Sequence, residues 1–302
     1  MHLVREGTSN IQVEEIVDIA RAAGRVILDV YKEDPETWDS RSKSDNTPVT
    51  KADIMADELI RTSLLRTYPD IPIISEETEQ VPYEQRKDFE YCWIVDPLDG
   101  TKEFIKRTGD FAVMIGLCFK GDPILGVVHA PAHDVPQTHY AVGGQGAFVL
   151  TGDACGEGLA GSERLRVRSF AMQDAGLTLA VSSSRPPQAF IAACNKPVTR
   201  SIGSAALKAI AVAEGTADIF PCLYSTSEWD TCATQVIVEE AGGSVVRYAS
   251  PQTQGVPDIS LLLGGLGFDG GRGRRSELRL SYNKEDLASP HCLFLGDCCR
   301  SP

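Results

Sequence analysis

The residues with the clearest potential for chemistry lie on a turn that follows an apolar run. The string WIVDPLDGT, residues 93–101, brings Asp96, Asp99 and Thr101 together on that turn. Its proline interrupts regular strand pairing, and its Asp-Gly pair is a strong turn signal. Asp and Gly are common in turns, so the stretch is compatible with an ordinary turn. Two carboxylates and a hydroxyl in one place are equally compatible with half of a metal site.

Four further carboxylates stand at the predicted ends of helices and strands, and each also has a purely structural reading. Asp53 follows Thr50 in the string TKAD and could complete a capping box at a helix start. Glu76 and Glu77 follow an apolar strand and could be solvated turn residues, while Asp230 could cap the helix after it. The alternative is that these carboxylates point into a shared cleft, where hard cations collect oxygen ligands.

The backbone of the first turn could complete such a site. The carbonyl of Leu98 could be a further ligand, and Gly100 allows a close approach of the backbone to a ligand. Amides of the following segment could hold a phosphate oxygen, and Thr101 could orient an attacking water. Together these groups match what metal-assisted hydrolysis of a phosphate ester requires.

Composition limits the classes of partner. The 302 residues carry a net charge of −13 with a pI of about 4.9, and such a chain lacks the basic face that nucleic-acid binding needs. An anionic substrate would require a local cation, for which bound metal ions are the obvious candidates. We therefore expect no nucleic-acid partner.

The chain also lacks the signals of membrane insertion and export. No apolar run is long enough for a membrane helix, and the N-terminus has neither the apolar core nor the cleavage site of a signal peptide. The nine cysteines are odd in number and contain no CxxC pair, which favours reduced thiols over disulfides or a structural zinc site. We expect no membrane partner and a cytoplasmic location.

Helices and short strands must position the candidate residues. Apolar spacing predicts a helix over residues 11–32, and a candidate N-cap at Thr50 with a stop at Tyr68-Pro69 predicts a second over residues 51–67. Mostly antiparallel strands joined by Gly-containing hairpins are predicted to follow. A Gly-rich stretch then predicts a domain boundary. The N-terminal helix-and-sheet domain would span residues 1–155 and carry most metal ligands. The C-terminal α/β domain would span residues 156–302 and contribute substrate contacts and Asp230.

Three other segments have simpler predictions. Residues 35–48 are polar and predict a loop, and residues 228–241 predict one helix. The glycine-arginine stretch 264–276 predicts a mobile loop, and neither this stretch nor the nine cysteines has a predicted role.

At this point the motifs resemble a known family. DPLDGT preceded by WIV, with TKAD and SEE upstream and WDTCATQVIVEEAGG downstream, is similar to the inositol monophosphatase superfamily across roughly residues 10–295. The continuation DPLDGTKEFIKRTGDF into PILGVVHAPA resembles the CysQ-type 3'(2'),5'-bisphosphate nucleotidases within it. The resemblance implies an α+β fold, a layered αβαβα sandwich of the inositol monophosphatase and fructose-1,6-bisphosphatase type.

The resemblance also assigns roles in the site. It implies two or three Mg²⁺ ions, inhibition by lithium, and Asp53 and Thr101 as the catalytic residues that hold the attacking water. Gly100 and Thr101 would also bind the phosphate of the substrate, and Glu77 and Lys102 are additional candidates near the site. The implied metal ligands are Glu76, Asp96, the Leu98 carbonyl, Asp99 and Asp230.

Substrate contacts come from the second half of the chain. CysQ-type enzymes have a Ser-Arg-Ser-His string where this chain has SSSR, so Ser184 and Arg185 are the predicted contacts. Arg185 could grip a second phosphate with two parallel hydrogen bonds, or it could be a solvated loop residue. Lys208, in GSAALK, matches a lysine that the family places near the substrate, although the family string is one residue shorter there. On sequence alone it would also pass for an exposed helix lysine.

These observations favour a Mg²⁺-dependent phosphatase that converts adenosine 3',5'-bisphosphate to AMP and phosphate, with the sulfated form, PAPS, as a further candidate substrate. The first alternative is a phosphatase of inositol mono- or polyphosphates. The second is a catalytically silent, metal-binding regulator. The partner would be a small phosphate ester, and the assembly a monomer or homodimer.

Overall fold

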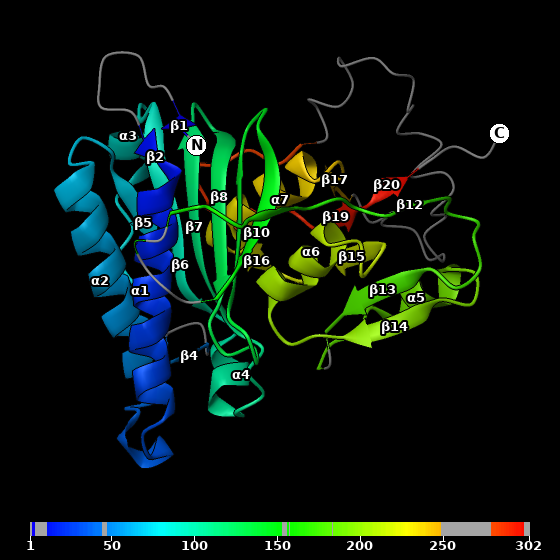
Figure 1. The fold of residues 1–302 in the computed structure, drawn as a ribbon, viewed down its shortest axis with the longest axis horizontal. Helices are drawn as coiled ribbons and strands as arrows, with labels where there is room; N and C mark the ends of the chain where they lie inside the picture. The colour runs from blue at the N-terminus through cyan, green and yellow to red at the C-terminus, as the bar shows by residue number, and fades with distance from the viewer. Residues whose placement is uncertain are drawn as a thin grey trace.

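The fold consists of five alternating layers of helix and sheet (Figure 1). A computed structural model describes residues 2–3, 11–43, 47–152, 156, 158–182, 184–248 and 279–298. Helices α1 (Val13–Tyr31) and α2 (Lys51–Thr67) form the first layer. A seven-stranded sheet, a second helix layer, a five-stranded sheet and a short helix follow in that order. This is the predicted αβαβα sandwich, and the two N-terminal helices agree with their predicted ranges.

The seven-stranded sheet is mostly antiparallel, as expected. Its order is β11-β10-β9-β8-β7-β6-β5, and only the β5–β6 pair is parallel. One face packs on α1 and α2 through Trp93 and Val95, while Cys92 and Ile94 face the second helix layer. The strands are β5 (Ile73–Ser75), β6 (Tyr91–Asp99), β7 (Ala112–Phe119), β8 (Asp122–Ala130), β9 (Gln137–Val142), β10 (Gly146–Thr151) and β11 (Glu163–Arg164).

The second helix layer lies between the two sheets and consists of α6 (Ala205–Ala213) and α7 (Cys232–Glu240). Helix α7 approaches the first sheet very closely at two glycines. A Cβ on Gly116 would lie 2.5 Å from the Cys232 sulfur, and one on Gly126 would lie 2.1 Å from the Ala233 carbonyl oxygen. The strands beneath α7 therefore need glycine at both positions.

The five-stranded sheet has the order β14-β13-β15-β19-β17 and is covered on its outer face by α5 (Gln188–Ala193). Strand β13 pairs in parallel with β14 and β15, whereas β19 runs antiparallel to its neighbours. The strands are β13 (Thr178–Val181), β14 (Val198–Ser201), β15 (Ile219–Cys222), β17 (Ser244–Arg247) and β19 (Cys292–Leu295).

Short elements complete the described chain. There are four two-stranded pairs in the described chain: β1–β2 and β3–β4 are local, whereas β12–β20 and β16–β18 join segments far apart in the sequence. Their strands are β1 (His2–Leu3), β2 (Ile11–Gln12), β3 (Arg41–Ser42), β4 (Pro48–Val49), β12 (Ser169–Phe170), β16 (Thr226–Ser227), β18 (Ala288–Ser289) and β20 (Asp297–Cys298). The remaining turns of helix are η1 (Pro35–Thr37), α3 (Tyr83–Arg86), α4 (Thr101–Ile105) and η2 (Glu228–Asp230).

Two local predictions are wrong. The stretch 35–48 is not only loop, because it contains η1 and pairs β3 with β4. The single helix predicted over 228–241 is two pieces, η2 and α7, which meet at Thr231. Because of this break, Asp230 lies in η2, which contacts the first sheet at β6 and β7.

The remaining predictions concern a loop, the domain boundary, the cysteines and membrane-spanning helices. The predicted loop 264–276 lies outside the described residues, and the boundary between residues 155 and 156 stays a prediction. Within the described part, six cysteines are free thiols: Cys92, Cys118, Cys194, Cys222, Cys232 and Cys292. Among the described helices, none combines the length and the apolar character needed to cross a bilayer.

Candidate active site

A bulge at the end of β6 brings Asp96 and Asp99 to the same side of the sheet. In a regular strand, side chains three positions apart point to opposite faces. Here Asp96 pairs with Met114 and Asp99 pairs with Ala112, so β6 has one more residue than its partner. The strand thus continues through its proline to Asp99, instead of ending before it, and presents both carboxylates together.

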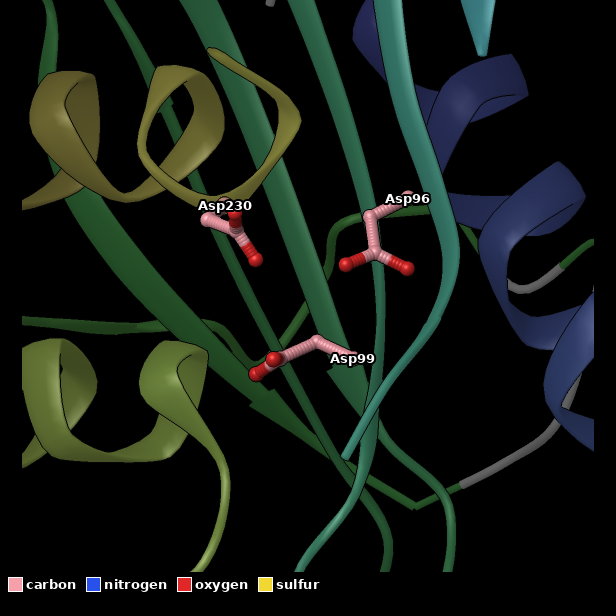
Figure 2. A group of neighbouring side chains, drawn as sticks. All are labelled: Asp96, Asp99 and Asp230. Carbon is pink, nitrogen blue, oxygen red and sulfur yellow. The ribbon is translucent and has the colours of Figure 1, made fainter. Parts of the chain in front are cut away.

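Asp230 joins this pair from η2, at the start of the second helix layer. One carboxylate oxygen from each of Asp96, Asp99 and Asp230 lies within 4.8 Å of the other two. Figure 2 shows the three side chains around one common space. Asp230 does not cap α7, whose N-cap is Thr231. Its Oδ2 instead accepts a hydrogen bond of 2.6 Å from the Ser227 amide across η2, which leaves the carboxyl group facing the other two.

The cluster is electrostatically unfavourable without a cation. Burial, together with the charges of Glu76, Asp99 and Asp230, raises the pKa of Asp96 well above its usual range. Burial, followed by the charge of Asp99, raises the pKa of Asp230 to about 8. Converging carboxylate oxygens are the ligands that hard divalent cations prefer. The residues therefore fit a metal ion, which would relieve the repulsion that these pKa values report.

A pH-dependent stability is expected from the cluster. A carboxyl group with a raised pKa holds its proton in the folded chain after the unfolded chain has released it, so folding stability falls from about pH 4 to about pH 8. In EDTA, the Tm should be several degrees lower at pH 8 than at pH 6. Saturating divalent metal should remove most of this difference. The variant Asp230→Asn serves as control and should flatten the EDTA profile, while equal wild-type Tm values at both pH values in EDTA would contradict the interpretation.

Asp53 caps α2 with one carboxylate oxygen and contacts Thr101 with the other. Its Oδ2 accepts hydrogen bonds from the Thr50 amide, at 2.7 Å, and the Thr50 hydroxyl, at 2.6 Å, so the predicted capping box is confirmed. Its Oδ1 accepts a hydrogen bond of 2.9 Å from the Thr101 hydroxyl, which lies 3.4 Å from the Leu98 carbonyl oxygen. The cap at the start of α2 thus fixes a buried carboxylate beside the turn after β6.

Glu76 and Glu77 share a cation that sequence reasoning missed. Lys43 Nζ lies 2.7 Å from Glu76 Oε1 and 2.7 Å from Glu77 Oε1. Burial raises the pKa of Glu77 to about 7, although the hydrogen bond and charge of Lys43 oppose the rise. The Glu76 amide donates to the Val95 carbonyl at 3.1 Å, which ties the end of β5 to the residue before Asp96. Lys43 belongs to a polar stretch without any helix or strand period, so no pattern singled it out.

The turn after β6 requires glycine. Gly100 adopts a φ of 98°, and a Cβ there would lie 2.7 Å from the Asp110 carbonyl oxygen. Thr101 then begins α4, as the sequence suggested, and Lys102 beside it is exposed. The turn can therefore pass close to Asp110 without displacing Thr101.

The residues predicted to contact the substrate differ in their surroundings. Ser184 and Arg185 are exposed, and the Arg185 amide donates to the Ser182 hydroxyl at 3.3 Å. Lys208 is 1% exposed, and its ammonium group contacts backbone carbonyls of the turn before α6. Burial lowers the pKa of Lys208, and the charge of Asp99 opposes the change. The roles of these residues in substrate binding stay predictions.

Comparison with known proteins agrees with the layers and the acidic cluster. The profile of the inositol monophosphatase family matches residues 10–269. The chain belongs to this family. The inositol monophosphatase family is a family of metal-dependent phosphatases, so the protein is an enzyme of the phosphatase class, and the family resemblance noted in the sequence is confirmed.

Relatives within the inositol monophosphatase family include proteins of the CysQ group. The 3'(2'),5'-bisphosphate nucleotidase CysQ of Escherichia coli K12 is 37% identical over 255 residues, which cover 83% of this chain and 96% of that protein. The protein of the same name from Aggregatibacter actinomycetemcomitans is 34% identical over 237 residues, covering 77% and 83%.

Solved structures of the family share the fold. CysQ from Bacteroides thetaiotaomicron superposes with a TM-score of 0.73 at 32% identity and covers 95% of this chain and 98% of its own. An inositol monophosphatase from Thermotoga maritima gives a TM-score of 0.63 at 29% identity, covering 78% and 85%. The predicted fold class is therefore confirmed.

Proposed function

We propose that this protein is a Mg²⁺-dependent 3'(2'),5'-bisphosphate nucleotidase that converts adenosine 3',5'-bisphosphate to AMP and phosphate. The observation that carries the proposal is the convergence of Asp96, Asp99 and Asp230 within 4.8 Å, beside the hydrogen-bonded pair Asp53 and Thr101. The similarity to CysQ proteins over most of the chain supports the choice of substrate.

The metal would be held by oxygen ligands. Two or three Mg²⁺ ions are the proposed number, because several buried carboxylates need compensating charge. When bound, Mg²⁺ supplies charge neutralisation of the phosphate and lowers the pKa of a water. The proposed ligands are Glu76, Asp96, the Leu98 carbonyl, Asp99 and Asp230.

The chain's own residues would move the proton and orient the water. Asp53 is 1% exposed and burial raises its pKa, which makes it a stronger proton acceptor than an exposed carboxylate. Two bonds from Thr50 hold one oxygen of Asp53, so the other oxygen faces Thr101 in a fixed direction. Thr101 donates to Asp53 and keeps its lone pairs for a water proton. Gly100 and Thr101 stay the proposed phosphate contacts.

A substrate comparison tests this function. Phosphate release from adenosine 3',5'-bisphosphate should be fast in Mg²⁺, absent in EDTA and inhibited by millimolar lithium. PAPS should be turned over at the same site, whereas inositol 1-phosphate and inositol 1,4-bisphosphate should react at least about tenfold more slowly. AMP, which has no 3'-phosphate, serves as the control compound in the assay of phosphate release.

The same measurement distinguishes the alternatives. A preference for an inositol phosphate would replace the nucleotide proposal by the first alternative. The string SSSR, which differs from the Ser-Arg-Ser-His of CysQ-type enzymes, is the feature that favours this alternative. No turnover of any substrate, with metal bound, would favour the silent regulator. That alternative is disfavoured because Asp53, Asp96, Asp99, Thr101 and Asp230 are all present.

A further inference from the structure

Lys208 is a buried cation that the proposed mechanism does not use. It lies in the first turn of α6 and is 1% exposed. Its Nζ donates to the carbonyl oxygens of Ile202 at 3.3 Å, Gly203 at 2.8 Å and Ser204 at 2.8 Å. A lysine ammonium has three donors, so all three are committed to this turn. None is left for a phosphate group of the substrate.

The same turn contacts the acidic cluster. Ser204 is the N-cap of α6, and its hydroxyl accepts a hydrogen bond of 3.1 Å from the Leu207 amide. The hydroxyl donates in turn to Asp99 Oδ2, and the Ala206 amide donates to the same oxygen at 2.7 Å. One oxygen of Asp99 is therefore saturated by the start of α6, and the other remains for a cation.

The turn is held in place from a third direction. The Gly203 amide donates to Asp110 Oδ2 at 3.0 Å. A Cβ on Gly203 would lie 2.2 Å from Glu103 Cγ and 2.9 Å from Asp110 Cβ. The backbone of residues 202–204 thus fits between Lys208 on one side and α4 with its following loop on the other.

We propose that Lys208 is a positioning residue for the metal site: it fixes the turn 202–204, and Ser204 then fixes the carboxylate of Asp99. The inference rests on the proposed function in one respect, namely that Asp99 binds the metal. Without the anchor, Asp99 is free to rotate away from the like charges of Asp96 and Asp230, and a rotated carboxylate binds a cation more weakly.

The test measures metal binding apart from turnover. Isothermal titration with Mg²⁺ alone should show about tenfold weaker binding for Lys208→Met and for Ser204→Ala, the loss expected for one charge-assisted contact. At saturating Mg²⁺, the KM for adenosine 3',5'-bisphosphate should change by less than about twofold. Because the two residues act in series, the double variant should bind Mg²⁺ about as well as the weaker single variant.

Matched controls separate this effect from general damage. Ser204→Thr keeps the hydroxyl and should bind Mg²⁺ as the wild type does, and Lys32→Met removes an exposed lysine far along the chain and should change nothing. Should Lys208→Met fail to fold, Ser204→Ala still decides, since it leaves the buried ammonium in place.

Three results would overturn the inference. The first is a KM raised tenfold or more in Lys208→Met with unchanged Mg²⁺ binding, which would make Lys208 a substrate contact. The second is wild-type Mg²⁺ binding in folded Ser204→Ala. The third is wild-type Mg²⁺ binding in Asp99→Asn, which would remove the premise. A wild-type protein that binds Mg²⁺ but does not hydrolyse the nucleotide would contradict the proposed function alone, and weakened binding in the two variants would still support the role of Lys208.

Discussion

Replacing Asp96 by Asn is expected to lower kcat/KM for adenosine 3',5'-bisphosphate by at least about a thousandfold. Burial of Asp96, together with the charges of Glu76, Asp99 and Asp230, raises its pKa well above the usual range. An amide there removes a charge that a divalent ion needs, and a metal contributes several kcal/mol of transition-state stabilisation, each 1.36 kcal/mol of which is a factor of about ten. Initial rates across a Mg²⁺ titration would measure the loss.

The fold of this variant should survive, and that can be measured separately. Asn can still accept the 3.0 Å hydrogen bond that the Leu98 amide makes to Asp96 Oδ1. Removing one of several repelling charges should leave the Tm in EDTA unchanged or higher. Asp70→Asn, at an exposed position, is the matched control and should keep full activity. Near-wild-type turnover in Asp96→Asn would exclude Asp96 from the metal site.

Replacing Asp53 by Asn should lower kcat by about a hundredfold to ten-thousandfold, the range that a positioned general base contributes. The amide has one acceptor oxygen, which the two donors of Thr50 would occupy. Its NH₂ group would then face Thr101 and reverse the hydrogen bond that Thr101 now donates. Both the proton acceptor and the direction of the hydroxyl would be lost.

The readouts for Asp53 must separate chemistry from helix capping. The KM and the Mg²⁺ requirement should change little, and the pH dependence of kcat should lose its acidic limb. Thr101→Ser keeps the hydroxyl and should stay close to wild type. Thr50→Ala removes the cap hydroxyl and should cost about 1 kcal/mol of stability. If Asp53→Asn fell only a few-fold in kcat, the base would have to be another group.

The sequence was most informative where one local rule decided the structure. Apolar spacing sufficed for α1, because it buries one stripe against the first sheet, and the end signals at Thr50 and Tyr68-Pro69 sufficed for α2. The Asp-Gly turn located the carboxylates near one another, since turn chemistry is local. The order of the five layers followed only from the family resemblance, because contacts between residues far apart in sequence leave no period in a single chain.

Other features depended on long-range contacts and could not be predicted. The bulge in β6 depends on pairing with β7, so a proline in the string did not reveal that the strand continues to Asp99. Lys43 reaches Glu76 across more than thirty residues, and its polar neighbours carry no pattern. Lys208 resembled an exposed helix lysine, yet it is buried because the carbonyls of the turn before α6 surround its ammonium group.

The glycines beneath α7 make the geometry of the site depend on how closely α7 packs against the first sheet. Asp230 is separated by one residue from the turn of helix that rests on Gly116 and Gly126, whereas Asp96 and Asp99 belong to β6, which pairs with the strand that contains Gly116. The distance between Asp230 and the two carboxylates of β6 therefore depends on the distance between α7 and the first sheet. That distance is short because Gly116 and Gly126 have no Cβ atom. Selection for metal affinity would therefore act on Gly116 and Gly126, which no ligand touches. Substitutions at these two positions would weaken metal binding without changing any acidic side chain.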